Sequence, residues 1–203
     1  MRRRAVSSGA LALLTAGALA AQQSPAGDLP AVPAGVPVVV LPVQSAVPEP
    51  GGTWVGGMES AQHTIDLLNA EIEFAFGEEA GASGWALAPA VAARLARNPT
   101  VGVDPGRLAY QGLLSAPDPG AQLYEPLHTQ LRQVAALFGA CLVLLPLSVS
   151  YRESRAVLQL AVIDVRRSAV LWHGAIEGAN AEAASSFALT TLALRLADRF
   201  APS

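Results

Sequence analysis

Three histidines are the side chains of this 203-residue chain best suited to acid–base or metal chemistry. His63 and His128 fall in stretches with helical periodicity, and His173 falls in a strand-like run. None has a second histidine or an acidic residue at the spacing of a helical zinc motif such as H-E-x-x-H. We therefore expect these histidines to be surface or edge residues, and we expect no metal site and no catalytic site.

Four glutamates lie close together between residues 71 and 79: Glu71, Glu73, Glu78 and Glu79. On a helix they form an acidic face, and such a face is usually solvated. A divalent cation is the alternative, but a hard cation needs converging oxygen ligands, which a convex helix surface does not supply. The pattern favours a solvated face.

Two glycine-containing stretches resemble known catalytic or binding loops in part. The pairs Gly51–Gly52 and Gly56–Gly57 lie between a strand and a helix, where a phosphate-binding loop would lie, but the G-x-G-x-x-G pattern is absent. Residues 81–84 approach a serine nucleophile elbow, but Trp85 replaces the last glycine and no strand precedes them. We interpret the first as a flexible loop and the second as a turn, and we expect no cofactor.

The composition excludes several classes of function. All 13 basic residues are arginines, which excludes a P-loop lysine, a Schiff-base lysine and a Ser-Lys dyad. The net charge is −3 and no basic run follows the first four residues, so nucleic acid is not an expected partner. Cys141 is the single cysteine, which we expect to act as a small hydrophobe.

The first 35 residues have the composition of targeting and linker segments. Arg2–Arg4, an apolar stretch and Ala18-Leu19-Ala20 predict a signal peptide over residues 1–20, cleaved before Ala21. No cysteine lies directly after the predicted signal peptide, so we expect no lipid anchor, and the apolar stretch is too short for a transmembrane anchor. Residues 21–35 are rich in Ala, Pro and Gly and predict a flexible tether. The expected location is periplasmic or secreted.

Three apolar, β-branched runs follow one another at residues 142–151, 157–165 and 170–176. Short polar links join them, and parallel strands would need crossovers of a dozen or more residues. The runs therefore predict a three-strand antiparallel meander. Asp164 is expected to fix the second turn.

The elements before and after the meander complete a single domain over residues 36–203. The sequence predicts strands at 36–43 and 84–87, helices at 60–77, 89–97, 125–139 and 181–200, and a helical turn at 107–110. Ser60 and Asn180 are expected N-caps. The predicted fold class is α/β (α+β), with one mixed sheet of about five strands and helices packed against it. Val40, Leu68, Leu144, Leu160 and Leu194 are expected to be buried together.

Three apolar motifs resemble one superfamily of bacterial envelope proteins. They are residues 38–43, residues 142–147 and the hairpin 163–172, which reads aspartate, basic residues, a turn and an apolar-apolar-Trp strand. The superfamily includes the TolB N-terminal domain and the CsgG and LpoB type proteins. The resemblance implies a non-enzymatic domain that binds partners at the cell envelope. The chain differs from TolB because no β-propeller repeats follow this domain.

The two longest irregular stretches, 44–57 and 101–122, each carry an aromatic residue, Trp54 and Tyr110. Exposed aromatic residues are common interface anchors, and loops on a rigid scaffold commonly carry function. These two residues are the candidate partner-binding residues. The alternative is that both rings fold back as lids over the sheet.

The sequence thus predicts a secreted, non-catalytic envelope domain that binds a protein or a cell-wall partner. A secreted small-molecule-binding protein or hydrolase that uses the long loops is the alternative. The sequence does not identify the partner or the oligomeric state.

Overall fold

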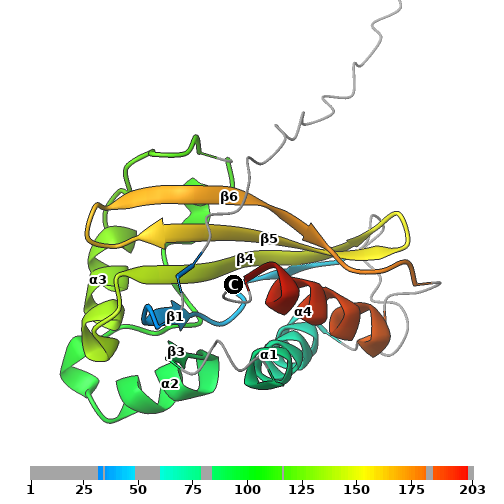
Figure 1. The fold of residues 1–203 in the computed structure, drawn as a ribbon, viewed down its shortest axis with the longest axis horizontal. Coiled ribbons are helices and arrows are strands. Elements are labelled where there is room, and N and C mark those ends of the chain that lie inside the picture. Colours follow the sequence, from blue (N-terminus) through cyan, green and yellow to red (C-terminus); the bar gives the residue numbers. More distant parts are fainter. Residues whose placement is uncertain are drawn as a thin grey trace, which may run out of the picture.

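The computed structural model describes residues 32–33, 35–48, 60–78, 84–115, 117–181 and 185–200 (Figure 1). The predicted signal peptide, nearly all of the predicted tether, and Trp54 lie outside these residues. The cleavage site and the tether therefore stay predictions.

Short strands and helices come first, between residues 38 and 138, and three long strands and a last helix follow between residues 142 and 200. The strands are β1 (Val38–Val40), β2 (Ala46–Val47), β3 (Trp85–Ala86), β4 (Leu142–Arg152), β5 (Arg155–Asp164) and β6 (Ala169–Glu177). The α-helices are α1 (Ala61–Glu78), α2 (Ala88–Ala96), α3 (Leu127–Phe138) and α4 (Ser186–Phe200), and two 3₁₀ helices are η2 (Pro99–Val101) and η3 (Tyr110–Leu113).

The strands form one mixed six-stranded sheet in the order β3-β1-β4-β5-β6, with β2 paired to one end of β4. Strand β1 runs parallel to β3 and β4, whereas β4, β5 and β6 form an antiparallel meander. The predicted fold class and the meander are confirmed. Strand β2 lies within residues 44–57, which the sequence predicted to be irregular.

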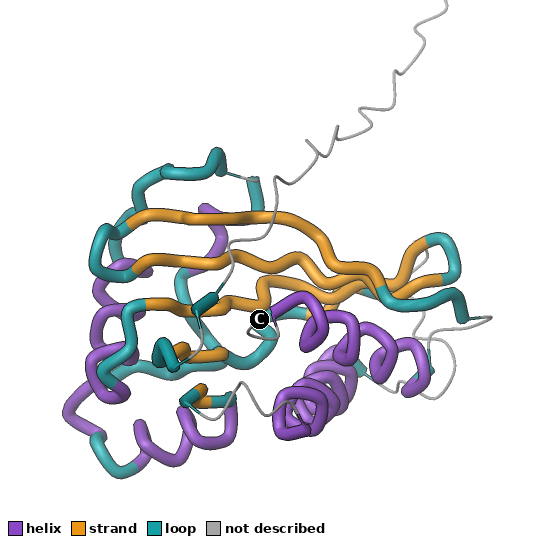
Figure 2. Tube along the Cα trace, in the orientation of Figure 1, coloured by secondary structure: helices purple, strands orange, loops and turns teal. Residues whose placement is uncertain are grey.

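Helices cover both faces of the sheet (Figure 2). Helices α1 and α4 pack on one face, and α2 and α3 pack on the other. Consecutive residues of β1 enter opposite cores, with Val38 and Val40 in the first and Val39 in the second. Because successive strand side chains point to opposite faces, a strand covered on both faces reads as an unbroken apolar run.

Four of the five predicted core residues are buried together on the α1 and α4 face, namely Val40, Leu68, Leu144 and Leu160. The prediction for Leu194 is wrong, because its side chain is 50% exposed. Helix α4 turns Leu189, Leu192, Leu196 and Phe200 toward the sheet at spacings of three and four residues. Leu194 lies between these positions on the outer side of the helix. The side chain of Phe187, in the first turn of α4, is also exposed.

Two of the predicted helix starts can be compared directly with the structure. Ser60 caps α1, since its Oγ accepts a hydrogen bond of 3.2 Å from the backbone N–H of His63. The predicted start of the last helix at residue 181 is wrong, because α4 begins at Ser186. Asn180 is not its cap: the Asn180 side chain accepts a hydrogen bond from Arg155, and the N–H of Ala181 donates to the carbonyl of Ser154. These contacts hold residues 180–181 against the β4–β5 turn.

The helical turn predicted at residues 107–110 forms three residues later, as η3. Gln44 contributes to this displacement. Its Oε1 accepts the backbone N–H of Leu108 at 3.0 Å, and its Nε2 donates to the carbonyl of Pro105 at 2.8 Å. The segment before Tyr110 is therefore held by the side chain of a buried glutamine from the end of the first strand region, together with a backbone hydrogen bond from Arg107 to Asp104.

Candidate functional site

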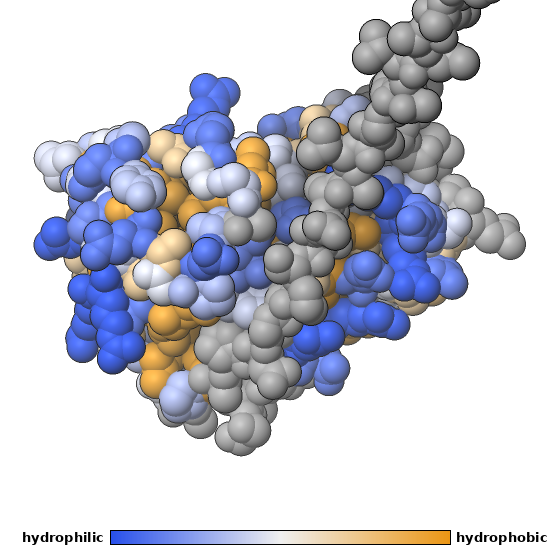
Figure 3. Space-filling model, turned by 90° about the horizontal axis from the view of Figure 1, so that it is seen from above, coloured by the Kyte–Doolittle hydropathy of each residue, from blue (hydrophilic) through white to orange (hydrophobic). Residues whose placement is uncertain are grey.

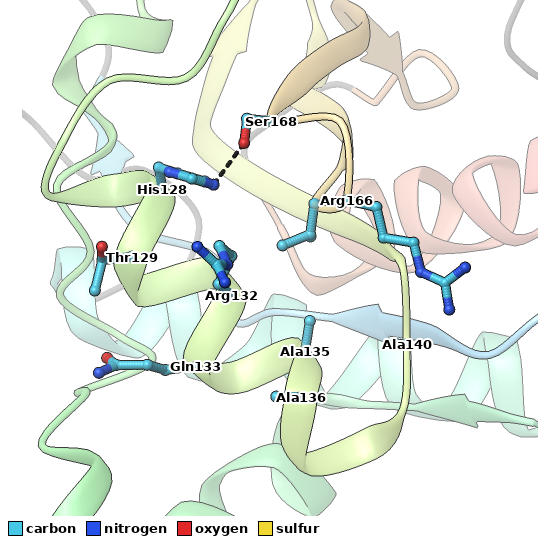
Figure 4. A pocket seen from close by; sticks show the side chains of 10 residues that line it. His128, Thr129, Arg132, Gln133, Ala135, Ala136, Ala140, Arg166 and Ser168 are labelled. Carbon is cyan, nitrogen blue, oxygen red and sulfur yellow. Dashed lines mark hydrogen bonds between the residues drawn. The ribbon is translucent and has the colours of Figure 1, made fainter.

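An open hollow of about 680 Å³ lies between α3 and the turn that joins β5 to β6 (Figure 4). Its walls combine polar side chains with small apolar ones: His128, Thr129, Arg132, Gln133, Ala135, Ala136, Ala140, Val165, Arg166 and Ser168. None of these is among the residues that the sequence analysis singled out as binding residues.

The hydrophobic pattern of α3 determines which of its side chains face the hollow. Leu127, Leu131 and Val134 are fully buried on the inner side of the helix. His128 and Arg132, each one position later than a buried leucine and four residues apart, then lie together along the flank of the helix that borders the hollow. Burial of the leucines therefore positions a histidine and an arginine in one row.

The opposite wall is a tight turn that Asp164 organises. Its Oδ1 accepts hydrogen bonds from the backbone N–H groups of Arg166 and Arg167, at 2.9 and 3.0 Å. Ser168 has a φ of 55°, in the left-handed region, where the chain reverses into β6. The predicted role of Asp164 is confirmed, and its consequence is that Arg166 and Ser168 are presented from a fixed turn.

His128 joins the two walls. Its Nε2 lies 2.5 Å from Ser168 Oγ, and its Nδ1 lies 3.4 Å from a carboxylate oxygen of Glu125 (Figure 4 shows the serine contact). Glu125 also accepts hydrogen bonds from the hydroxyl and the backbone N–H of Thr129. The hydroxyl hydrogen bond is the main cause that holds the pKa of Glu125 below its ordinary value. Glu125 thus contacts both Thr129, in the first turn of α3, and His128.

Arg132 and Arg166, which line the hollow, differ from the neighbouring Arg167 in their pairing. Arg167 lies 3.6 Å from the carboxylate of Asp164, although most of its side chain is exposed. Arg132 and Arg166 are exposed, and neither makes an ion pair with any residue that the structure describes. Two cationic groups therefore flank the hollow with their charge available. In the view from above, onto the β6 edge, hydrophilic residues and smaller hydrophobic patches share the surface (Figure 3).

His173 lies on β6, away from this hollow. Its Nε2 is buried and has no hydrogen-bond partner among the described residues. Burial lowers the pKa of His173, and the neighbouring backbone of Leu113 acts in the opposite direction. His63 is exposed on α1. Across the described parts of the chain, no three His, Cys, Asp or Glu side chains gather as a metal site would require.

The two predicted binding residues do not lie in the hollow. Tyr110 begins η3, is half-buried, and packs against the core on the α2 and α3 face. Trp54 lies outside the described residues. The structure therefore places Tyr110 in contact with the core and leaves its role as a binding residue a prediction.

His128 was a candidate from the sequence alone, but it could not be grouped with the other residues of the hollow because they come from distant segments. His128 and Ser168 are 40 residues apart, and Glu125 precedes His128 by three residues, which is not the spacing of a zinc motif. The sequence feature that pointed to this site was the adjacent pair Arg166 and Arg167, which lies in a predicted turn. Tyr124, four residues before His128, was also missed, and its side chain is 82% exposed.

The side chains around the hollow have the features of two kinds of chemistry, the binding of anions and serine-type hydrolysis. Unpaired guanidinium groups donate several hydrogen bonds in a planar fork that matches carboxylates and phosphates. The order Ser168, His128, Glu125 is also the order of nucleophile, base and orienting acid in serine hydrolases. However, the 3.4 Å separation of His128 and Glu125 exceeds ordinary hydrogen-bond length, and Glu125 is already bound by Thr129.

No protein-family model matches this sequence, and no curated protein matches it as a relative. Among solved structures, it is similar to the LpoB C-terminal domain from Escherichia coli, at 17% identity over 75% of this chain and 88% of that chain, with a TM-score of 0.42. The LpoB C-terminal domain from Salmonella enterica matches at 16% identity over 72% and 84%, with a TM-score of 0.41. A PelC dodecamer from Paraburkholderia phytofirmans matches at 13% identity over 85% and 93%, with a TM-score of 0.39.

Among the residues that the structure describes, no helix combines the length and the apolar character needed to cross a membrane.

Proposed function

We propose that this chain is a non-catalytic binding domain of the bacterial cell envelope, which holds a protein or cell-wall partner. The observation that carries the proposal is the hollow between α3 and the β5–β6 turn, flanked by Arg132 and Arg166, which make no ion pair with any described residue. Arginine and tyrosine are enriched at protein interfaces and supply much of their binding energy. Tyr124 lies within one helical turn of His128, because its carbonyl accepts the His128 N–H at 3.2 Å.

We also propose roles for residues 1–35, for Trp54 and for Tyr110, which are predictions from the sequence. Residues 1–20 act as an export signal and residues 21–35 as a tether, which gives a periplasmic or secreted domain without a lipid anchor. Trp54 and Tyr110 are proposed as additional contacts of the partner. No nucleic acid and no cofactor takes part.

Cross-linking from intact bacterial cells tests the proposal. A photoreactive benzoylphenylalanine replaces Tyr124, and in a matched protein it replaces Leu194, which is also exposed but lies on the other face of the sheet. We expect a discrete adduct of higher mass from position 124 and none from position 194. Equal adducts from both positions, or none from position 124, would contradict a binding surface at this end of the molecule.

One observation favours a second candidate function, serine-type hydrolysis, namely the short contact between Ser168 Oγ and His128 Nε2. A fluorophosphonate reagent, which labels activated serines, distinguishes the two functions. The binding proposal expects Ser168 to remain unlabelled, as in the Ser168→Ala variant. Labelling of Ser168 that is lost in His128→Gln would establish the hydrolase instead.

A further inference from the structure

We propose that the hollow binds the carboxylates of an acidic peptide segment of the partner, one that also carries apolar side chains. This inference rests on the proposed function and names the chemistry of the partner at the same site. Three features of the hollow support it: its charge, the composition of its floor, and the rigidity of its walls.

The charge around the hollow is locally positive on an acidic chain. The chain has a net charge of −3, yet the charged side chains that line the hollow are Arg132 and Arg166. The two nearby carboxylates are both occupied: Asp164 binds two backbone N–H groups and lies beside Arg167, while Glu125 binds Thr129 and lies beside His128. An anionic group that enters the hollow therefore meets cationic side chains that no acidic residue of the described part of the chain neutralises.

The floor of the hollow favours a larger ligand than an inorganic anion. Ala135, Ala136, Ala140 and Val165 line it with small apolar side chains. The volume of about 680 Å³ falls within the range of pockets that hold ligands of many atoms. A ligand that satisfies both the arginines and this floor needs acidic and apolar groups together, and a peptide with alternating acidic and apolar residues has both.

The walls are held in place before any ligand arrives. Helix α3 is fixed by its buried leucines, and the turn is fixed by the Asp164 hydrogen bonds. The contact of His128 with Ser168 joins the helix to the turn (Figure 4). A rigid site loses less entropy on binding than a mobile one, which is why preorganisation favours affinity.

A peptide array tests the inference with the purified full chain. The array carries hexapeptides that combine glutamate, leucine and alanine in every order, with a second set in which glutamine replaces glutamate. We expect selective binding to peptides that contain both glutamate and leucine. The Kd of a selected peptide, measured by fluorescence anisotropy, is expected to rise about tenfold or more in Arg132→Gln and in Arg166→Gln, because each removes charged hydrogen bonds.

Arg199→Gln is the matched control. It removes the same charge from α4, on the other face of the sheet, and we expect it to leave the Kd unchanged. Equal binding to the glutamate and glutamine sets would overturn the inference. So would a Kd that is the same in wild type, Arg132→Gln and Arg166→Gln.

Two further arms distinguish other carriers of the anion. Phosphatidylglycerol vesicles test a lipid headgroup, and muropeptides test cell-wall carboxylates. If either binds in a manner that depends on Arg132 and Arg166 while no array peptide binds, the peptide assignment is overturned. The cross-linking experiment from position 124 is independent of this result. Adducts there with a silent array would leave the proposed binding function standing and remove only the acidic-peptide inference.

Discussion

Ser168 Oγ lies 2.5 Å from His128 Nε2, so that one contact joins the flank of α3 to the turn between β5 and β6. The serine sits at a φ of 55°, which costs energy for a residue other than glycine. The contact has therefore to offset a local backbone cost, and the two effects can be separated by substitution.

Ser168→Ala removes the hydroxyl but keeps a Cβ at the left-handed position, whereas Ser168→Gly removes both. We expect Ser168→Ala to lower the free energy of unfolding by about 0.5–1.5 kcal/mol, the usual net value of one hydrogen bond. Ser168→Gly should lose less, because glycine adopts the positive φ without strain. Chemical denaturation measures both. A glycine variant less stable than the alanine variant would show that backbone strain at this turn is not significant.

A second prediction concerns the two leucines whose expected burial had different outcomes. Leu144 is fully buried in β4, so Leu144→Ala should cost about 2–5 kcal/mol in the free energy of unfolding. Leu194 is half exposed, so Leu194→Ala should change it by less than about 0.5 kcal/mol. Urea denaturation of the two variants under the same conditions is the measurement. Similar losses of free energy in the two variants would show that α4 buries Leu194 against the sheet.

The sequence predicted the sheet well because its signals are local. The runs that form β4, β5 and β6 are long, apolar and joined by short polar links, which leaves antiparallel pairing as the only arrangement. The buried face of α4 was harder to predict from the sequence, because alanines fill many of its inward positions and contribute little to a hydrophobic pattern. Ala188, Ala193 and Ala197 are buried there, while the larger Phe187 and Leu194 point outward.

The hollow could not be predicted from the sequence because it depends on tertiary contacts. Arg132 and Arg166 each resemble an ordinary solvated arginine in the sequence. Only the packing of α3 against the sheet places them around one space, and only the Asp164 contacts show which arginine is paired. The hydrogen bonds of Gln44 to residues 105 and 108 are of the same kind, since they join segments more than 60 residues apart.

Gly178 offers a test of how closely α4 packs on the end of β6. A Cβ at this position would lie 3.0 Å from both the carbonyl oxygen of Ala188 and the hydroxyl of Thr191. We expect Gly178→Ala to destabilise the protein by about 1–3 kcal/mol, because backbone in α4 would have to move. Gly77→Ala is the control: apart from its chain neighbours and the backbone of its own helix, no described atom lies within 4 Å of where the new Cβ would be, and alanine favours a helix by about 0.5–1 kcal/mol. Thermal unfolding should show Tm shifts of opposite sign.

The pH dependence of stability should reflect His173. Burial lowers its folded-state pKa below the ordinary value of 6.5, so the unfolded chain binds a proton at a higher pH than the folded chain does. The contribution of neutral His173 to the free energy of unfolding is therefore fully present above pH 6.5. It is lost as the pH falls from 6.5 through the folded-state pKa. Denaturation of wild type and His173→Gln between pH 5 and 8 measures the difference. A decline of equal size in both proteins would assign the effect to other groups.

Tyr110 and Tyr124 distinguish a ring that covers the core from a ring that anchors a partner. Tyr110 is half-buried and packs against the core on the α2 and α3 face, so Tyr110→Ala should lower the free energy of unfolding by about 1–3 kcal/mol. Tyr124 is almost fully exposed, so Tyr124→Ala should change stability by less than about 0.5 kcal/mol while it weakens partner capture. Stability is measured by denaturation and capture by cross-linking through a second exposed position. If Tyr110→Ala loses capture with its stability intact, Tyr110 is the anchor that the sequence predicted, and the binding surface extends to η3.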